Sequence, residues 1–388
     1  MTHGQEQRPA GVARADPVSV PFLDLLSIHA PLREAILADV SDLITTSAFS
    51  NGPAVAGFER AFARYCDSRH AVGVGSGLDA LRLGLIASGL QAGDEVLVPA
   101  ATFVATVEAV SQAGGSPVVV DIRDDDYNID PDAAAAAVGE RTRALLPVHL
   151  YGQMADMRAL RRLADAHGLT MIEDACQAHG ARRDGAGPGA CGRAAAFSFY
   201  PGKNLGAMGD AGALITDDAE LAARVRALRE HGQRRKYHHD ECGYTARLDT
   251  LQALVLLRKL PGLDDCNRQR VLAARYYLDH LEDVGDLVMP PIAPGSAPAW
   301  HLFVVRTGRP ESLAAFLRDR GIATGRHYPQ PIHVTGAYRA LGYRIGQFPV
   351  SERLARETLS LPIFPGISES QLDATVRAVR AYFASVAR

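Results

Sequence analysis

One lysine of the chain stands in a setting suited to covalent chemistry. Lys203 follows the apolar run Ala194–Tyr200 and a Pro-Gly break, and a glycine-rich stretch continues from it to Gly212. Apart from Lys203 itself, no charged residue lies between Arg193 and Asp210. A lone lysine is usually a solvated surface charge, but apolar surroundings disfavour the ammonium form and lower its pKa. We therefore interpret Lys203 as an imine-forming lysine at the mouth of a strand.

A carboxylate ends a second strand-like run upstream of this lysine. The run Leu169-Thr-Met-Ile-Glu-Asp174 has the character of a strand and ends in an acid, and open α/β sheets bind ligands at the carboxyl ends of their strands. Pyridoxal phosphate chemistry requires an imine-forming lysine and a carboxylate that keeps the pyridine nitrogen protonated. Lys203 and Asp174 would supply both groups.

The elements that must position these groups follow an alternating pattern. Short apolar runs predict strands at residues 71–74, 95–99, 117–122, 144–150, 170–174, 195–200 and 213–216. Between them, segments such as 157–164 place apolar residues at helical spacing. Strands that alternate with helices predict an α/β fold with a mainly parallel sheet, covered on both faces.

A glycine-rich turn follows the first predicted strand and opens a helix. Its amides and the helix dipole suit a phosphate group, and Ser76 adds a hydroxyl. The same letters also satisfy the dinucleotide pattern at Gly75, Gly77 and Ala80. A nicotinamide enzyme needs an acid after the next strand, whereas Asp94-Glu95 precede that strand here. We disfavour the dinucleotide interpretation, while a merely structural turn stays open.

Composition narrows the class of protein. The chain has 388 residues and a net charge of −3, with a pI near 6.5, so we expect no nucleic-acid partner. Its five cysteines are odd in number and scattered, which favours a reducing cytoplasm over a disulfide framework. No apolar run reaches the roughly 18 residues of a spanning helix, so we expect no membrane segment.

The chain is long enough for two domains. Residues 1–18 are polar, contain prolines and glycines, and lack the apolar core of a signal peptide, so we expect a disordered arm. A large domain is predicted at 19–258 and a smaller α+β domain at 259–388. The boundary is placed where Lys259-Leu-Pro-Gly262 interrupts a helix.

Two segments resemble a known family. Glu173-Asp-Ala-Cys-Gln-Ala-His-Gly-Ala181 and Ser198-Phe-Tyr-Pro-Gly-Lys-Asn-Leu-Gly-Ala-Met-Gly-Asp-Ala-Gly212 resemble the DegT/DnrJ/EryC1/StrS sugar aminotransferases, which are fold type I pyridoxal-phosphate enzymes. The resemblance extends from Phe22 to Phe364. It implies a three-layer αβα fold, with pyridoxal phosphate on Lys203 and Asp174 beside its ring nitrogen.

The resemblance also implies further cofactor contacts. An aromatic residue such as Phe103 is by itself more often core, but the resemblance implies that it stacks on the cofactor ring. Gln177 would lie near the phenolic oxygen, and Ser198 would join the Ser76-Gly77 turn near the phosphate. Thr245 stands where the family has an asparagine that reaches the phosphate across a dimer, and its hydroxyl is shorter and poorer in donors. We expect His179 to be a buried, hydrogen-bonded histidine.

Two polar segments are candidates for the substrate. Residues 233–240 would ordinarily form a solvated loop, but the resemblance implies that such a loop approaches the partner subunit's active site. Residues 326–333 contain two histidines six positions apart around two prolines, a spacing without helical ligand geometry, so we expect no metal. The substrate candidates are Lys236, Tyr237, His238, Arg247, His327, Tyr328 and His333. An interface ion pair would explain Arg247 equally well.

The function implied by the resemblance is amino transfer from glutamate to a nucleotide-linked keto-deoxysugar, with ping-pong kinetics in a homodimer. Some relatives carry histidine in place of the lysine and are dehydratases, so Lys203 argues against that branch. The sequence around Lys203 most resembles enzymes that aminate carbon 3 of a dTDP-3-keto-6-deoxyhexose. Amination of carbon 4 of a dTDP- or UDP-4-keto sugar, a nicotinamide-dependent sugar oxidoreductase and a non-catalytic regulatory protein are the alternatives.

Overall fold

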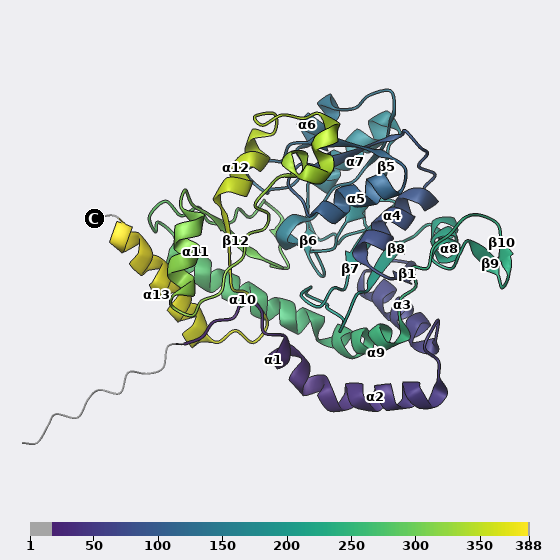
Figure 1. Ribbon diagram of the computed structural model, residues 1–388, viewed down its shortest axis with the longest axis horizontal. Helices are drawn as coiled ribbons and strands as arrows, with labels where there is room; N and C mark the ends of the chain where they lie inside the picture. The colour runs from purple at the N-terminus through teal and green to yellow at the C-terminus, as the bar shows by residue number, and fades with distance from the viewer. Residues whose placement is uncertain (1–17, 387–388) are drawn as a thin grey trace, which may run out of the picture.

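A seven-stranded sheet forms the centre of the computed structural model, which describes residues 18–386 (Figure 1). The predicted arm at 1–18 therefore lies, apart from Val18, outside the described residues. The strand order is β1-β8-β7-β5-β4-β2-β3, and β8 is antiparallel to both of its neighbours while the other pairs are parallel. The strands are β1 His70–Val74, β2 Glu95–Pro99, β3 Ser116–Val120, β4 Thr142–Leu145, β5 Thr170–Asp174, β7 Ala194–Ser198 and β8 Gly212–Thr216.

All seven predicted strands form, because each apolar run is buried on both sides of the sheet. Successive side chains of a strand point to opposite faces, so Met171 of β5 packs into one apolar core and Ile172 into the other. Near-continuous apolar runs are typical of strands buried on both faces. The predicted three-layer α/β architecture with a mainly parallel sheet is confirmed.

Two sets of helices cover the sheet. On one face lie α4 Gly77–Ala87, α5 Val104–Gln112 and α8 Ala219–Leu228. On the other face lie α3 Pro53–Tyr65, α6 Pro131–Ala136, α7 Met157–His167 and α9 Thr250–Lys259. Local signals set several of these ends, since the side chains of Ser76 and Asp156 cap α4 and α7, and Gly168 ends α7 in the left-handed conformation.

A separate core lies in the C-terminal part of the chain. The antiparallel strands β12 Phe303–Arg306 and β13 Thr358–Leu361 pack with three helices around this core, and Val20 from the N-terminal side joins it. The helices are α10 Leu263–Leu281, α11 Pro310–Arg318 and α13 Glu369–Val386. Residues Ile332, Tyr338 and Phe348 instead join the core under α4 and α5. The domain limits 19–258 and 259–388 stay a prediction.

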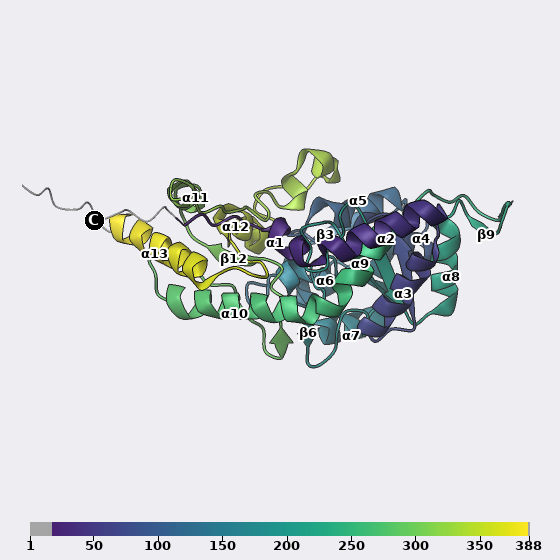
Figure 2. The same ribbon diagram turned by 90° about the horizontal axis from the view of Figure 1, so that it is seen from below.

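Several shorter elements complete the fold. The helices α1 Leu25–His29 and α2 Arg33–Thr46 run along the outside near α9 (Figures 1 and 2). The hairpin β9 Gln233–Arg235 and β10 His238–His239 projects from the body of the chain in both views. The others are η1 Ala30–Leu32, η2 Leu150–Gly152, β6 Arg182–Arg183, η3 Leu260–Gly262, β11 Ser296–Ala297, η4 Ile332–Val334, η5 Gly336–Leu341 and α12 Pro349–Glu357. Within residues 18–386, no helix combines the length and the apolarity that a membrane crossing requires.

Candidate active site

The turn that carries Lys203 lines a cavity of about 580 Å³ at the carboxyl ends of β5 and β7. We call it the catalytic cavity. The amide of Lys203 donates to the carbonyl oxygen of Tyr200 at 2.8 Å, which closes the turn after the strand. Burial lowers the pKa of the Lys203 amine, and the neighbouring Cys176 and Asp174 act in the opposite direction. This direction agrees with the expectation from the apolar sequence around this lysine, and the imine-forming role of Lys203 stays a prediction.

Asp174 ends β5 and faces the same cavity. One carboxylate oxygen accepts a hydrogen bond from Thr106 Oγ1 at 2.7 Å, and the other accepts one from the amide of Cys176 at 3.1 Å. Thr106 lies in α5 and also contacts the hydroxyl of Thr102 at 2.7 Å. These donors hold the buried carboxylate in place.

The residue before Asp174 points to the opposite face of β5. Glu173 is fully buried, and its carboxylate accepts from the amides of Gly189 at 2.9 Å and Gly192 at 2.6 Å. The Nδ1 atom of His149 accepts from the amide of Ala155 at 3.2 Å, so its Nε2 donates to Glu173 at 2.9 Å. The two adjacent carboxylates thus have separate tasks: Glu173 anchors loops and Asp174 faces the cavity.

The first turn of α4 provides a site for an anion. Ser76 is the N-cap and accepts from the amide of Asp79 at 3.0 Å, whereas the first amides of any helix lack intrahelical partners. Ser76, Gly77 and Ser198 line the catalytic cavity together. A Cβ atom on Gly77 would lie 2.7 Å from both Cys176 Sγ and Ser198 Cβ, so only glycine allows this close approach.

Aromatic and amide groups form another wall of the cavity. The ring centroids of Phe103 and Tyr328 are 5.5 Å apart, and Phe103 is 51% exposed at the cavity mouth. Gln177 accepts from the amide of Tyr151 at 2.7 Å and donates to the hydroxyl of Tyr328 at 3.1 Å. The ring of His327 lies beside them, and burial together with Lys203 lowers its pKa to about 4.

Six of the candidate residues do not line the catalytic cavity of their own chain. Lys236, Tyr237 and His238 belong to the projecting β9–β10 hairpin (Figure 1). The hydroxyl of Thr245 lies 3.3 Å from Nε2 of His231, and Arg247 donates to Glu230 at 2.9 Å. His333 is buried and its Nε2 lies 3.1 Å from Glu352, and its contact with a substrate stays a prediction.

The expectation for His179 is half right. His179 is fully buried, but neither of its ring nitrogens has a hydrogen-bond partner among the described residues. Its ring packs against Phe197 and Phe199 instead, and burial followed by the charge of Lys203 lowers its pKa to about 3. The imidazole is therefore neutral at physiological pH.

Several residues that line the cavity were not assigned a role from the sequence, and Thr106, Tyr200, Arg270 and His301 are among them. Thr106 sits three residues after Phe103 on the same helix start, a spacing that places both on one face and is a usable signal. Arg270 and His301 come from distant segments, and nothing local marks them.

The described residues fit pyridoxal phosphate. A buried lysine with a lowered pKa, a fixed carboxylate, an aromatic ring and the amide end of α4 share one cavity. Such a lysine and carboxylate match the aldehyde and the pyridine nitrogen of this cofactor, and the helix end matches its phosphate. Fold and site together define the class: the protein is a pyridoxal-phosphate-dependent aminotransferase.

Comparison with known proteins gives the family. A family model described as "DegT/DnrJ/EryC1/StrS aminotransferase family" matches residues 31–380, and the chain belongs to this family. It is 48% identical over 368 residues to a dTDP-3-amino-3,4,6-trideoxy-alpha-D-glucose transaminase of Streptomyces venezuelae, covering 95% of this chain and 97% of the relative. It is 47% identical over 364 residues to the erythromycin biosynthesis sensory transduction protein EryC1 of Saccharopolyspora erythraea, covering 94% and 100%.

Solved structures agree with this membership. The crystal structure of DesV from S. venezuelae matches with a TM-score of 0.92 at 47% identity, covering 94% of this chain and 98% of that chain. NtdA from Bacillus subtilis, solved with bound cofactor PMP, matches with a TM-score of 0.88 at 30% identity, covering 96% and 86%. Membership in an aminotransferase family excludes the nicotinamide-dependent oxidoreductase.

Proposed function

We propose that the protein transfers the amino group of glutamate to carbon 3 of a dTDP-3-keto-6-deoxyhexose, in the biosynthesis of a deoxyaminosugar for a natural product such as an antibiotic. One observation carries the transaminase chemistry: Lys203, with its lowered pKa, and the fixed carboxylate Asp174 line the same cavity. The substrate is supported by the 48% identity to a transaminase named for a dTDP-3-amino sugar.

Each residue then has a chemical task. Bound pyridoxal phosphate supplies an aldehyde that links to amines and a ring that withdraws electrons from the carbon being deprotonated. Lys203 would hold the cofactor and then move a proton through its Nζ atom, which a lowered pKa favours near neutral pH. The charge of Asp174 would keep the pyridine nitrogen protonated, while Thr106 keeps Asp174 in position.

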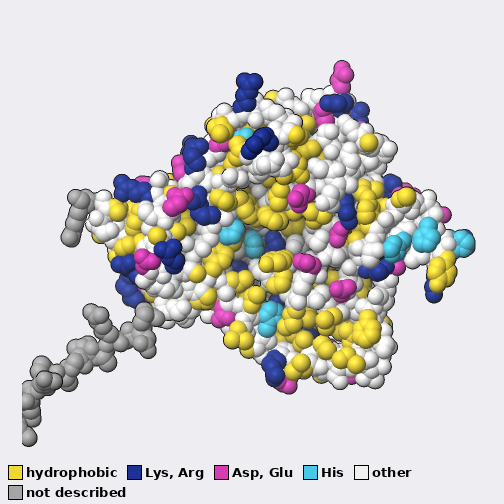
Figure 3. All heavy atoms as spheres, viewed as in Figure 1, with side chains coloured by type: hydrophobic (Ala, Val, Ile, Leu, Met, Phe, Trp, Pro, Cys, Tyr) yellow, Lys and Arg dark blue, Asp and Glu magenta, His cyan; other side chains and the backbone are white. Residues whose placement is uncertain are grey.

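We also infer that the protein is a homodimer whose two chains share their active sites, and that it resides in the cytoplasm. Phe103 and Tyr200 line the catalytic cavity but are 51% and 59% exposed, which leaves room for a second chain at its mouth. Apolar side chains are also exposed on and near α2, which runs along the bottom of the molecule in Figure 1. In the same view, Figure 3 shows hydrophobic side chains gathered over this region. They are Leu26, Leu37, Ile44, Phe49, Met208 and Leu251.

The polar candidates outside the cavity fit the same arrangement. We propose that the β9–β10 hairpin, with Lys236, Tyr237 and His238, and the nearby Thr245 and Arg247 reach the catalytic cavity of the partner. Tyr237 is 79% exposed at the hairpin turn, an aromatic surface that a second chain would cover. All five cysteines are free thiols, which supports a reducing compartment.

A substrate panel tests the proposal. The purified protein with pyridoxal phosphate and glutamate is offered 3-keto and 4-keto sugars linked to dTDP or UDP, and the aminated product is located by NMR. We expect the highest kcat/KM with a dTDP-linked 3-keto-6-deoxyhexose. A higher value with a 4-keto sugar would move the reaction to carbon 4, and no amination of any sugar would reject the proposed function.

A further inference from the structure

Arg270 is a buried arginine in the wall of the catalytic cavity. It lies on α10, is 2% exposed, and lines the catalytic cavity together with Lys203. A second cavity of about 210 Å³ adjoins the first, and its lining again includes both Lys203 and Arg270. Burial keeps the pKa of His301 well below its ordinary value, and the charges of Lys203 and then Arg270 lower this pKa further. Lys203 and Arg270 therefore lie in the walls of the same two cavities.

The hydrogen bonds of Arg270 leave its charge without a counter-ion. Its Nη1 atom donates to the carbonyl oxygens of Ile363 at 2.9 Å, Trp300 at 3.2 Å and His301 at 3.3 Å. Its Nε atom is buried and has no hydrogen-bond partner among the described residues. Within residues 18–386, no carboxylate oxygen lies within 4.0 Å of this guanidinium. The backbone carbonyls orient the side chain but carry no net negative charge.

Another shielded arginine of the same C-terminal region is arranged differently. Arg306 is 8% exposed and has Glu357 at 3.0 Å and Asp124 at 3.4 Å. Burial lowers the pKa of Arg270 to about 10, so its guanidinium still carries a proton at neutral pH. A buried charge without a partner is costly, and an anion that enters the cavity would remove that cost.

Three anions enter an enzyme of this class: the cofactor phosphate, the nucleotide diphosphate and the carboxylates of the amino-acid donor. The groups suited to the cofactor phosphate are Ser76, Gly77 and Ser198, and none of them contacts Arg270 through a hydrogen bond. A diphosphate is bulky, whereas Arg270 offers only its deeply buried donors. The α-carboxylate is one bond from the carbon that loses its proton, so it must lie beside Lys203.

We propose that the guanidinium of Arg270 binds the α-carboxylate of the amino-acid donor and holds the donor's α-carbon beside Lys203. This assignment rests on the transaminase function proposed above. A planar guanidinium can donate two parallel hydrogen bonds to a carboxylate. The backbone carbonyls on Nη1 would fix the plane of the guanidinium before the donor arrives.

The test compares two donors and two half-reactions. L-glutamate and its α-carboxamide, L-isoglutamine, are mixed separately with the cofactor-loaded enzyme, and the change in cofactor absorbance gives the rate and apparent affinity of the donor half-reaction. We expect the wild type to favour glutamate by about 100-fold, the size of one lost charged pair. In Arg270→Met this ratio should approach 1. The keto-sugar half-reaction, started from the aminated cofactor, should change less than about threefold.

Two more variants separate binding from folding. Arg270→Lys keeps a charge but not the planar fork, so we expect an intermediate ratio of about 10 between the two donors. Arg306→Met removes the matched arginine and should lower the melting temperature while leaving the ratio unchanged. The compound 2-methylglutamate has no proton on its α-carbon and therefore binds without reacting. Calorimetry should show that Arg270→Met binds it about 100-fold more weakly than the wild type does.

Each outcome bears on a different claim. If Arg270→Met melts at a lower temperature but still distinguishes glutamate from isoglutamine as the wild type does, the arginine only ties backbone carbonyls together and the proposal is wrong. If Arg270→Met does not fold, an unchanged donor ratio in Arg270→Lys contradicts the proposal equally. If the wild type shows no absorbance change with any amino acid, the transaminase function itself fails, and Arg270 fails with it.

Discussion

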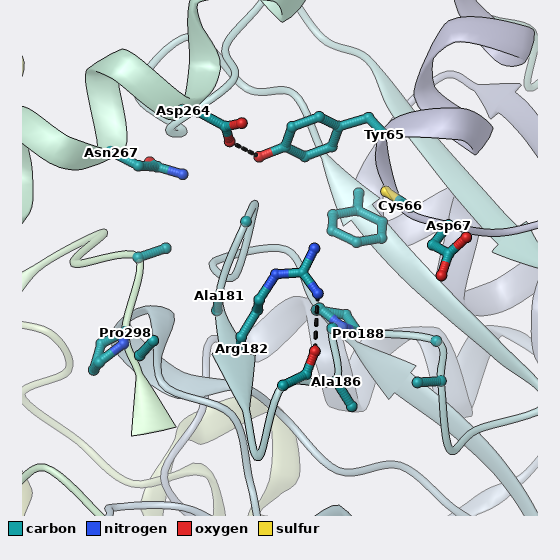
Figure 4. Close-up of a pocket in the computed structure, with 18 of the residues that line it drawn as sticks. Tyr65, Cys66, Asp67, Ala181, Arg182, Ala186, Pro188, Asp264, Asn267 and Pro298 are labelled. Carbon is teal, nitrogen blue, oxygen red and sulfur yellow. Dashed lines mark hydrogen bonds between the residues drawn. The ribbon is translucent and has the colours of Figure 1, made fainter. Parts of the chain in front are cut away.

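Two cavities of this protein differ in size and in the way their charges are compensated. The larger one, of about 960 Å³, lies among the end of α3, residues 180–190 and the start of α10, and we call it the outer cavity (Figure 4). There Tyr65 donates to Asp264 at 2.7 Å, and Arg268 forms an ion pair with Asp265. In the catalytic cavity of about 580 Å³, Lys203 and Arg270 have no carboxylate within 4.0 Å among the described residues.

This contrast shows why cavity size does not locate the chemistry. A charge that is paired, or exposed to solvent as Arg182 is, is already compensated, so a ligand gains little by binding it. An unpaired buried charge is available to a reactant and has a shifted pKa. The smaller cavity is therefore the reactive one, and the following predictions test the contrast.

The largest effect is expected for Lys203→Ala. Removal of the amine abolishes both attachment of the cofactor and proton transfer, so kcat/KM should fall by at least about 10³-fold. Steady-state amination and the visible absorbance of the bound cofactor measure this. Arg268→Ala in the outer cavity is the control and should keep both. If Lys203→Ala kept wild-type turnover, Lys203 would not be the nucleophile.

The next effect concerns the two carboxylates of β5. Asp174→Asn should lower kcat by about 100-fold, because a preorganised charge at the reacting centre is lost. The control Glu173→Gln changes the carboxylate on the other face of the strand. It should lower the free energy of unfolding while leaving kcat of the folded fraction within about threefold. Equal losses of kcat in the two variants would argue against separate tasks.

A smaller effect is expected for Gly77→Ala. The added methyl group would lie 2.7 Å from Cys176 Sγ and Ser198 Cβ, so the first turn of α4 must shift. Overpacking of this kind costs about 1–3 kcal/mol of stability, and we expect cofactor affinity to fall about tenfold. In the control Gly57→Ala the new Cβ would meet only Leu257, at 3.6 Å. Equilibrium dialysis against pyridoxal phosphate compares the two variants.

Acid should lower the stability of the folded protein through His327 in the catalytic cavity. The pKa of His327 is about 4 in the folded protein, below the ordinary value near 6.5, because burial and Lys203 disfavour the charged ring. The unfolded chain then binds more protons between pH 6.5 and 4, so stability present above pH 6.5 is lost as the pH falls through this window. Melting temperatures measured from pH 7 to pH 4 should fall less steeply for His327→Gln than for the wild type.

The smallest effect is expected for Arg182→Ala in the outer cavity. Arg182 is exposed and donates to the carbonyl oxygen of Gly185 at 2.9 Å (Figure 4). Its removal should change stability by no more than about 0.5 kcal/mol and kcat/KM by less than twofold. A larger loss of activity would give the outer cavity a role in catalysis and break the contrast.

The sequence was sufficient for features with a local signal. Apolar runs predicted all seven strands of the large sheet, and the break at Lys203 marked the turn that lines the catalytic cavity. It was not sufficient where distant segments meet. The guanidinium of Arg270 is oriented by the carbonyls of Trp300, His301 and Ile363, and an arginine in a helix resembles a surface charge until those segments are placed. The sequence also could not show that the ring nitrogens of His179 have no hydrogen-bond partner among the described residues and that its ring packs against Phe197 and Phe199.

The alternation of Glu173 and Asp174 along β5 limits how this strand can evolve. Inserting or deleting a single residue just upstream would shift the strand by one position, so that Glu173 would point to the face of Asp174 and Asp174 to the face of Glu173. The anchor of the loop at Gly189 and the carboxylate that faces the catalytic cavity would then be lost together. Homologous proteins that use this cavity should therefore tolerate substitutions in the strand but no change in its length.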